Sequence, residues 1–471
     1  MEQRNEINKN ISLSINNNHN CDSLMIKTDK IEKEEKLEII TEEQNNQKNK
    51  NMNKERDNIY DKEQKNFLIS NEFGFKYDIS LKQILPVGLR NLGNSCFMNC
   101  SLQCFYHCSK FTSEILENFQ KYEKMKCPVL SCYLEVLSNL YNNGKESYER
   151  QSIKLHKIDD DDDEYEQDKV CCCERRGIKK NTKNYNYKTG TNPASAKELY
   201  TYIMKNYSNK LYKNGSDPKI VAEIILSTMN KEIDPNFGYI RDNKISKNDE
   251  ILLFNHIFNY YEKNKNVITS NFYWIKEKIN ICNECEKETY NLQSEYISYF
   301  YPEAIINGLN IKMDNNENRY KLNLDNCFEY FHISEQLDVN SFTCKICNKR
   351  VKAKSILNYM ATLPKYLVLC ICKDKDEKNP INYIFDYNQE IDLEKYYRKH
   401  PQNNYSTKYK FHCGCYSKSD YFHMIAYCVH FDGLIYEFND SLYNKYDYDL
   451  KNITKIKKPY LLIYRREDID I

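Results

Sequence analysis

The sequence predicts an α+β fold, with helices in the first part of the chain and strands after them. Apolar residues recur at helical spacing from Ile84 through SLQCFYHCSKFTSEILENF and CPVLSCYLEVLSNLY, and again from Ala194 to about Ile233. After Trp274 the chain consists of short runs rich in Tyr, Ile, Leu and Val, separated by Asn, Asp and Gly, which is typical of strands and turns. Because helices and strands are segregated rather than alternating, an α+β fold is favoured.

The length and charge of the chain narrow the classes of protein to consider. With 471 residues it can form one large enzyme domain with tails and insertions, or two or three domains of usual size. Its 69 Lys and Arg against 68 Asp and Glu give a net charge of +1, so we expect neither nucleic acid nor a membrane as a partner. The beginning, MEQRNEINKN, has no apolar targeting segment, and the run YLVLCIC is too short to cross a bilayer. We therefore expect a soluble intracellular protein, cytoplasmic, nuclear or both.

Two polar segments set the expected domain organisation. Residues 1–83 are rich in Asn, Lys and Glu and are predicted to be a disordered N-terminal extension. Residues 143–192 contain DDDDDEYEQD and CCCERR and are predicted to be a solvated insertion within a folded region, residues 84–466. No metal is assigned to the triple cysteine Cys171 to Cys173, because no histidines accompany it. The twenty cysteines of the chain, without a secretion signal, are expected to be reduced thiols.

Cys96 follows a tight Gly-Asn-Ser turn and begins a helical run, in the stretch GLRNLGNSCFMNCSLQCF. A helix N-terminus favours the thiolate, which is the nucleophilic form of cysteine. The turn allows close approach of a substrate carbonyl, and the amide of Asn91 can donate to an oxyanion. The pattern also fits a second interpretation, since Cys96, Cys100, Cys104 and Cys108 recur every four residues and can line one buried helix face.

A second candidate group lies in the segment YFHMIAYCVHFDGLIYEFNDSLY, which is predicted to be a β-hairpin. Folding the hairpin about its turn places His423, at the start of one strand, opposite Asn439 and Asp440 at the end of the other. A cysteine hydrolase needs such a base and a polar group that orients it. His430, at the turn, and His412, in the strand-like YKFHCGC, are expected to be structural.

Two CxxC pairs are candidate metal ligands, namely Cys282 with Cys285 and Cys344 with Cys347. Each pair can present two thiolates to one tetrahedral Zn²⁺. Residues 286–343 separate the pairs, which is far more than in an ordinary zinc ribbon, so two unrelated redox or structural pairs remain an alternative.

The cysteine stretch resembles the cysteine box of the ubiquitin-specific proteases, whose pattern is close to GL-x-N-x-GN-T/S-C-Y/F-MN-S-x-LQ. The resemblance implies that Cys96 is the nucleophile and that Asn91 is the oxyanion-hole residue. Cys100 stands where the family usually has a serine, so Cys100, Cys104 and Cys108 are expected to pack the helix.

The histidine segment resembles the second box of the same family, which runs approximately G-H-Y-x-A-Y-x, then a turn, then W/Y-x-x-F-D/N-D-S. This match implies that His423 is the general base, Asn439 its orienting partner and Asp440 the second polar residue of the box. The stretch SEQLDVNSFTCKICNKRVKAKSILNYMATLPKYLVLCI is similar to the family segment around its second CxxC pair. It implies one structural zinc ion held by Cys282, Cys285, Cys344 and Cys347.

The resemblance covers roughly Ile84 to Arg466 and implies a papain-like cysteine protease fold with thumb, palm and zinc-bearing β fingers. The thumb is expected at about 84–235, the palm and fingers at about 236–466, and the fingers around 275–355. The implied activity is that of a ubiquitinyl hydrolase, which cleaves the bond after the C-terminal glycine of ubiquitin. Ubiquitin and ubiquitinated proteins are the implied partners.

Two departures from the family pattern leave other functions open. Of the family motif Gln-Gln-Asp-Ala-x-Glu-Phe only Asp217 is retained, although the helix after it keeps a core-facing pattern. Tyr421 and Phe422 replace the glycines that usually precede the base. The alternatives are a weakly active or inactive ubiquitin-binding scaffold, a protease for another ubiquitin-like modifier, and a zinc-stabilised interaction module without thiol chemistry.

Overall fold

The computed structural model describes residues 81–155, 192–214, 217–235, 250–314, 316–332, 343–350, 353–372, 381–401, 404–417, 423–446 and 459–470. Residues 1–80 of the predicted extension, the acidic run with Cys171 to Cys173, and the pair Tyr421 and Phe422 lie outside the described residues. The domain boundaries proposed from the sequence therefore stay predictions.

The first part of the described chain is helical, as predicted from its apolar spacing. After a short 3₁₀ turn, η1 (Leu81–Gln83), it forms α3 (Cys96–Tyr106), α4 (Ser109–Glu117), α5 (Phe119–Lys124), α6 (Pro128–Leu155), α7 (Lys197–Asn214), α8 (Pro218–Glu223), the π-helical turn η3 (Ile224–Thr228) and α9 (Met229–Ile233). Asp217 caps α8 by accepting a hydrogen bond from the backbone of Lys219. The expected core-facing pattern of this region is confirmed, because Val221, Ile225 and Met229 are buried.

Helix α6 continues to Leu155, well beyond Asn143, where the sequence suggested the beginning of a polar insertion. Gly144 packs so closely on the preceding segment that a Cβ there would lie 2.4 Å from Ile84 Cγ2. Ser147 is buried and donates to the carbonyl of Asn143. A small residue and a hydroxyl with its own backbone acceptor thus fill buried positions, so hydropathy alone could not reveal this part of the helix.

Four helices lie outside the segments that were predicted to be helical, so the prediction was incomplete. Two of them precede Trp274, where no element was predicted, and two interrupt the strand-like region after it. They are α10 (Glu250–Asn264), α11 (Val267–Phe272), α12 (Pro302–Gly308) and α13 (Leu324–His332). Local signals for two of them exist in the sequence. Asn266 and Thr269 form a capping box at the start of α11, and Pro302 is the first residue of α12.

The largest sheet has the strand order β12-β11-β10-β9-β13-β6-β3, with β8 paired to β9. All of its neighbours are antiparallel except β3 and β6. The strands are β3 (Ile297–Phe300), β6 (Tyr366–Ile371), β8 (Glu390–Asp392), β9 (Lys408–Ser417), β10 (Met424–Val429), β11 (Ile435–Asn439), β12 (Leu442–Lys445) and β13 (Pro459–Arg466).

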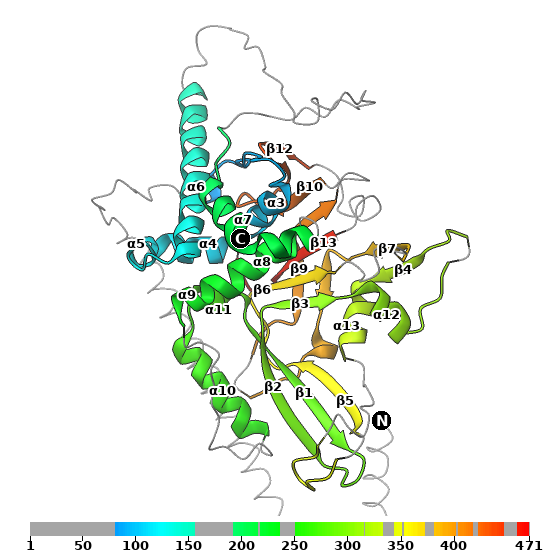
Figure 1. Cartoon of the computed structure of the whole chain (residues 1–471). Coiled ribbons are helices and arrows are strands. Elements are labelled where there is room, and N and C mark those ends of the chain that lie inside the picture. Colours follow the sequence, from blue (N-terminus) through cyan, green and yellow to red (C-terminus); the bar gives the residue numbers. More distant parts are fainter. Residues whose placement is uncertain are drawn as a thin grey trace, which may run out of the picture. The chain divides into compact units, whose positions relative to one another are not determined.

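Two smaller sheets and a 3₁₀ turn, η4 (Glu394–Tyr396), complete the described part. In the three-stranded sheet, β1 (Trp274–Cys282) lies between β2 (Glu288–Glu295) and β5 (Ala353–Met360). β4 (Tyr320–Asn323) and β7 (Tyr383–Asp386) form a parallel pair. In Figure 1 the three-stranded sheet projects from the large sheet on the side away from α6.

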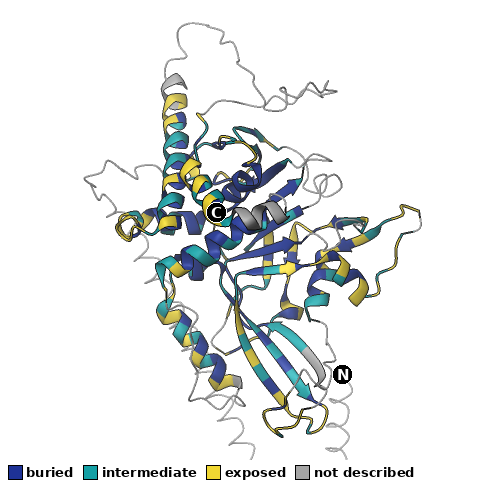
Figure 2. Ribbon diagram, in the orientation of Figure 1, coloured by how far each residue is buried: buried dark blue, intermediate teal, exposed yellow. Residues whose placement is uncertain are grey.

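The large sheet is buried on both faces, and the alternation of side chains along β13 shows how. Leu461 and Ile463 belong to the core that contains α3, whereas Leu462 and Tyr464 belong to the core that contains residues of α12 and α13. Every residue of α3 is buried, and Figure 2 accordingly colours this helix dark blue. Helix α3 is therefore a central element, packed against the sheet rather than lying on the surface.

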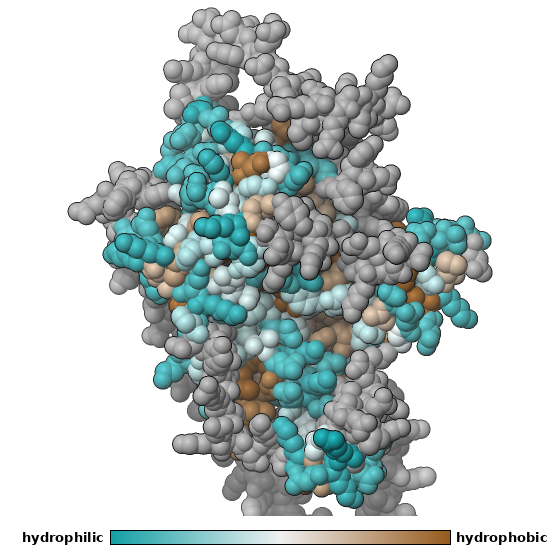
Figure 3. Space-filling view, in the orientation of Figure 1, coloured by the Kyte–Doolittle hydropathy of each residue, from teal (hydrophilic) through white to brown (hydrophobic). Residues whose placement is uncertain are grey.

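No helix among the described residues is long and apolar enough to span a membrane. On the face seen in Figure 3, hydrophobic side chains occur in small separate areas among hydrophilic ones. The large hydrophobic side chains that are exposed in the described part are Met125, Ile251, Leu252, Tyr299, Tyr301, Met313, Ile346 and Leu434.

Candidate active site and metal centre

The turn before α3 has the left-handed backbone that its Gly-Asn sequence favours. Gly93 has φ of +88° and Asn94 has φ of +60°, and both residue types tolerate this region. The Ser95 hydroxyl accepts a hydrogen bond from the Leu92 backbone at 2.9 Å. Tyr200 of α7 donates its hydroxyl to the Gly93 carbonyl at 2.8 Å. The turn is thus fixed from both sides immediately before Cys96.

Asn91 lies beside this turn and also contacts a distant part of the chain. Its side-chain oxygen accepts from the Gly93 backbone at 2.9 Å, and its amide nitrogen donates to Asp440 Oδ2 at 2.7 Å. Asn99, one turn into α3, donates to the other carboxylate oxygen of Asp440 at 2.8 Å. The Asp440 carboxylate therefore accepts hydrogen bonds from the side-chain amides of Asn91 and Asn99 at the same time. The role of Asn99 was not recognised from the sequence, although it is the Asn of the MN pair in the cysteine box.

Asp440 occupies a left-handed turn between β11 and β12, with φ of +52°. Its carbonyl accepts from the Leu89 backbone at 2.8 Å, so the turn lies directly against the segment before Asn91. This approach requires glycine at position 88, because a Cβ there would lie 2.3 Å from Ser441 O. Burial raises the pKa of the Asp440 carboxyl, while hydrogen bonds from Asn99 and Asn91 oppose the shift.

The predicted hairpin is confirmed, with Ala426 opposite Phe438 and Val429 opposite Ile435. His423 immediately precedes β10, and its Nε2 lies 2.6 Å from Asn439 Oδ1. Because an amide oxygen can only accept, Nε2 carries the proton of the neutral ring. The lone pair of the neutral imidazole is then on Nδ1, which is the nitrogen available to act as a base.

Cys96 lies at the junction between α3 and the hairpin. The backbone amide of Met424, the residue after His423, hydrogen-bonds to its thiol. Burial nevertheless raises the pKa of Cys96 to about 12, because a thiolate loses its hydration there. The residue is only 6% exposed. The resting thiol is therefore protonated at neutral pH.

The neighbouring cysteines occupy packing positions, as expected: Cys100 and Cys104 lie on α3, and Cys108 lies just after it, at the start of α4. All three are buried, and Cys104 Sγ lies 3.5 Å from Cys415 Sγ on β9. His412 is also buried, and its Nε2 lies 2.7 Å from a backbone carbonyl, that of His107.

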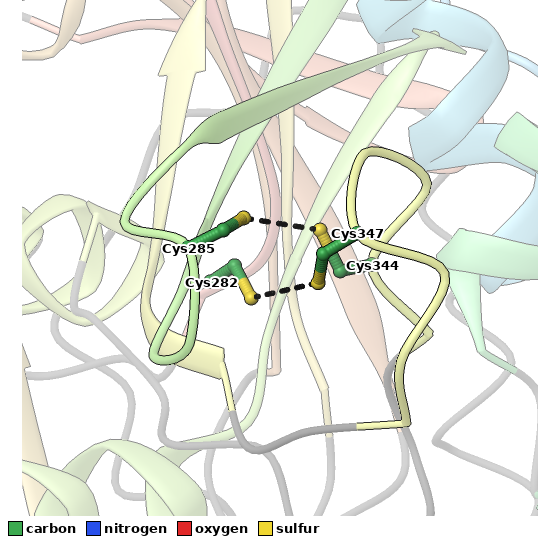
Figure 4. Close-up of side chains that lie close together, drawn as sticks. All are labelled: Cys282, Cys285, Cys344 and Cys347. Carbon is green, nitrogen blue, oxygen red and sulfur yellow. Dashed lines mark hydrogen bonds between the residues drawn. The ribbon is translucent and has the colours of Figure 1, made fainter.

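The four cysteines of the two CxxC pairs come together at one end of the three-stranded sheet, where β1 ends and β5 begins (Figure 4). Cys282 Sγ lies 3.9 Å from Cys347 Sγ, and Cys285 Sγ lies 3.6 Å from Cys344 Sγ. All four sulfur atoms are within 4.8 Å of one another. Four thiolates at the usual Zn–S distance in a tetrahedral site are separated by about 3.8 Å, so the described geometry fits one zinc ion.

The two CxxC turns have the same local structure. In one, Cys282 accepts at its carbonyl from the Glu286 backbone, and in the other Cys344 accepts from Asn348. Glu286 and Asn348 have nearly equal left-handed φ values, +54° and +56°. Desolvation raises the pKa of Cys344, whereas backbone N–H groups of residues 346 and 347 and the thiols of Cys347 and Cys285 lower it, to about 7 overall. The contacts among the thiols have the opposite effect on Cys285 and Cys347, whose pKa values are raised.

Comparisons with known proteins identify the family and the fold. The family described as ubiquitin carboxyl-terminal hydrolase (UCH) matches residues 87–464. The probable ubiquitin carboxyl-terminal hydrolase 4 of Schizosaccharomyces pombe is 46% identical over 39 residues, which span 8% of this chain and 7% of that protein. The solved SAGA DUB module of Ubp8, Sgf11, Sus1 and Sgf73 bound to monoubiquitin matches with a TM-score of 0.52 and 16% identity, over 88% of this chain and 76% of that chain, which shows a shared fold. The chain therefore belongs to the ubiquitin carboxyl-terminal hydrolase family, and its α+β fold is that of the ubiquitin-specific proteases.

Proposed function

We propose that this protein is a cysteine-type deubiquitinase that hydrolyses the bond after the C-terminal glycine of ubiquitin. The observation that carries the proposal is the meeting of two sequence-distant elements. The thiol of Cys96, at the start of α3, contacts the backbone of Met424, and the adjacent His423 is oriented by Asn439. A nucleophile, a base and an orienting amide are the parts that thiol hydrolysis needs.

In the proposed reaction, Nδ1 of His423 takes the thiol proton as the sulfur of Cys96 attacks the glycine carbonyl carbon. The resulting oxyanion accepts hydrogen bonds from backbone amides at the helix start and from Asn91. An amide nitrogen has two hydrogens, so Asn91 can donate to Asp440 and to the oxyanion together. His423 then protonates the leaving amine, and water, deprotonated by the same ring, hydrolyses the thioester.

The metal centre has a structural role in this proposal. Cys282, Cys285, Cys344 and Cys347 would hold Zn²⁺ with all four positions filled by thiolates. Such an ion cross-links the tips of β1–β2 and β5 and contributes to folding. No step of the hydrolysis involves it.

A second candidate function is a ubiquitin-binding scaffold with little turnover. It is favoured by the burial of Cys96 and by the rise of its pKa to about 12, since a neutral buried thiol is a poor nucleophile until its proton is removed. The two functions differ in turnover but share the binding of ubiquitin.

The experiment is hydrolysis of a fluorogenic amide at the C-terminus of ubiquitin by the full chain. We expect turnover in the natural protein, none in Cys96→Ala, and a loss of about 10²–10⁴-fold in His423→Ala. His256→Ala, an exposed histidine on α10, is the matched control and should retain full activity. Binding of ubiquitin without hydrolysis would favour the scaffold, and hydrolysis only of another ubiquitin-like modifier would reassign the substrate.

A further inference from the structure

Two buried histidines join the far ends of α3, which begins at Cys96, and β10, which His423 immediately precedes. His107 follows the last residue of α3, and His430 follows the last residue of β10. Each side chain is 1% exposed. His107 Nε2 lies 2.9 Å from His430 Nδ1, so the rings are in hydrogen-bond contact.

The other nitrogen of each ring faces a backbone carbonyl. His107 Nδ1 lies 2.7 Å from Gln103 O, and His430 Nε2 lies 2.7 Å from Ile84 O. Carbonyl oxygens only accept, so both outer nitrogens must carry a hydrogen. A neutral imidazole has only one N–H. If each ring uses its N–H for its carbonyl partner, His107 Nε2 and His430 Nδ1 face each other at 2.9 Å with two lone pairs and no hydrogen between them. Three short contacts need three N–H groups, whereas two neutral rings supply two.

Two features around the histidine pair stabilise one positive charge, namely the helix dipole and the aromatic rings. His107 lies at the C-terminal end of α3, where the helix dipole favours a cation. Aromatic rings surround the pair, with Phe431 stacked on His107 at 5.5 Å, and such rings attract cations through their faces. The further ring contacts of the two imidazoles are made by Tyr106, Phe438 and Tyr436.

The titratable groups that face the pair determine how many protons it takes and on which ring. Burial lowers the pKa of His107 and the charge of His430 lowers it further; the hydrogen bond to Gln103 O raises it, and the charge of His412 lowers it again. Burial also lowers the pKa of His430, but Ile84 O and the carboxylate of Asp432 raise it. Together these groups leave the pKa of each ring below its usual value, which excludes two protons on the adjacent rings. One proton is retained only where the three short contacts outweigh burial, and the Asp432 carboxylate makes His430 the ring better placed to hold it.

We propose that His107 and His430 share a single proton, which makes the pair a buried cation and closes a clamp between the ends of α3 and β10. His430 then donates through both nitrogens, to His107 Nε2 and to Ile84 O, while His107 donates from Nδ1 to Gln103 O. The proposal requires that these charge-assisted contacts outweigh the cost of burial. The proton count does not depend on the proposed activity. If that activity holds, the two histidines are positioning residues for Cys96 and His423.

The direct test is NMR of the full chain labelled with ¹⁵N-histidine, between pH 6 and 8.5. Signals are assigned by their loss in His107→Gln and His430→Gln. We expect three ring N–H groups from the pair at pH 6.5, with both nitrogens of one ring protonated. Two N–H groups, one from each ring, across the whole pH range would overturn the proposal. The N–H count is made on the natural protein, and if a variant folds poorly the pair is assigned instead through the proximity of the Phe431 ring, which stacks on His107.

The second test is thermal and denaturant unfolding as a function of pH. Unfolded histidine has a pKa of about 6.5, so a proton that the folded pair keeps above this pH stabilises the fold. That contribution is lost as the pH rises through the pKa of the pair, by at most about tenfold per pH unit in the unfolding equilibrium constant. Glutamine in His430→Gln is a neutral donor and acceptor that binds no proton. The unfolding equilibrium constant of this variant should therefore lack the pH dependence that comes from the pair.

His412→Gln is the matched control for both tests. His412 is buried in the same group, but its Nε2 has one carbonyl partner, His107 O, which a neutral ring satisfies. We expect this variant to keep the pH slope of the natural protein. An equal slope in natural protein and His430→Gln, or loss of the slope in His412→Gln alone, would contradict the shared proton.

Discussion

One carboxylate, that of Asp440, organises the candidate site around the proposed nucleophile, Cys96. Asp440 accepts from Asn91 and Asn99 through separate oxygens, and its own carbonyl accepts from Leu89. These partners precede and follow Cys96 in the sequence, so Asp440 fixes the nucleophile segment on both sides. The side chain thus stabilises the position of Asn91, which is the proposed oxyanion donor.

Replacing Asp440 by asparagine should impair catalysis more than folding. Asparagine keeps the shape but has one acceptor instead of two, so one of the amides of Asn91 and Asn99 would face another N–H donor. We expect kcat for a ubiquitin amide to fall about 10–100-fold, the range for losing one well-aligned hydrogen bond in a site, with a smaller change in KM. Asp325→Asn on α13 is the control. Unchanged kcat in Asp440→Asn would show that the carboxylate does not position Asn91.

The raised pKa of Cys96 predicts the pH dependence of its alkylation in the free protein. Only the thiolate reacts, and below a pKa of about 12 its fraction rises tenfold per pH unit. The rate of Cys96 modification by iodoacetamide, measured by peptide mass spectrometry, should therefore increase continuously from pH 6 to 9.5. A plateau below pH 8 would mean that the resting site already contains a thiolate.

Residues within the two sequence boxes could be predicted, whereas their long-range partners could not. Cys96 stands at a helix start, and His423 and Asn439 are brought together by one short hairpin, so local spacing suffices. The contact between Tyr200 and Gly93 depends on how α7 packs, and Asn99 meets Asp440 across most of the chain. No local periodicity encodes such contacts.

Among the elements, the two CxxC turns are the part of the fold that we expect to depend most on a metal. The hydrophobic cluster around the four sulfur atoms contains no other buried residue among those described, so little else holds the tips together. We expect Cys285→Ser to lower zinc content from about one ion per chain towards zero and to lower Tm, because structural zinc contributes directly to folding. Elemental analysis and calorimetry provide the measurement.

Cys132→Ser on α6 is the control for the zinc prediction, since Cys132 lies in the helical part outside the four-cysteine cluster. It should leave zinc content unchanged. Purified natural protein without zinc, and with the same Tm after chelation, would contradict the metal centre.

The contact between the segment before Asn91 and the β11–β12 turn depends on one glycine. Gly88→Ala would place a Cβ 2.3 Å from Ser441 O and 2.6 Å from Asp440 O, both backbone atoms that cannot rotate away. We expect a loss of several kcal/mol in unfolding free energy, as for other overpacked buried sites, together with reduced activity.

Gly433→Ala gives a comparison without a clash. Gly433 has φ of +81° but nothing within 4 Å of an added Cβ, so only backbone strain of about 1–2 kcal/mol is expected, with activity retained. Denaturant unfolding and ubiquitin amide hydrolysis measure both effects. If Gly88→Ala were no worse than Gly433→Ala, the described approach at Ser441 would be wrong.

The elements that sequence analysis missed have weak hydropathy signals for physical reasons. Helices α10 and α13 are rich in Asn, Tyr and Phe, residues of low helix propensity, so their amphipathic spacing competes with a strand-like composition. Helix α6 continues past Asn143 by burying small and polar residues. In contrast, α3 and the β10–β11 hairpin were predictable because spacing and turn chemistry agree there.

Across the described part of the chain as a whole, the candidate site forms where the helical part meets the large sheet. Cys96 belongs to the helices and His423 leads into the sheet, and both sides contribute to one continuous core that includes Leu102, Ala426 and Ile463. The relative position of the proposed nucleophile and the proposed base is therefore set by the same packing that stabilises the fold. Folding of this domain and formation of the site should be inseparable.

The most direct test of the central claim, that Cys96 attacks the C-terminal glycine of ubiquitin, is adduct formation with ubiquitin carrying a C-terminal thiol-reactive group. Intact-mass spectrometry of the full chain should show one ubiquitin added, and peptide mapping should place it on Cys96. The Cys96→Ala protein should form no adduct, while Cys100→Ala should react as the natural protein does. An adduct on Cys100 or another thiol, or none under conditions in which ubiquitin binds, would contradict the account.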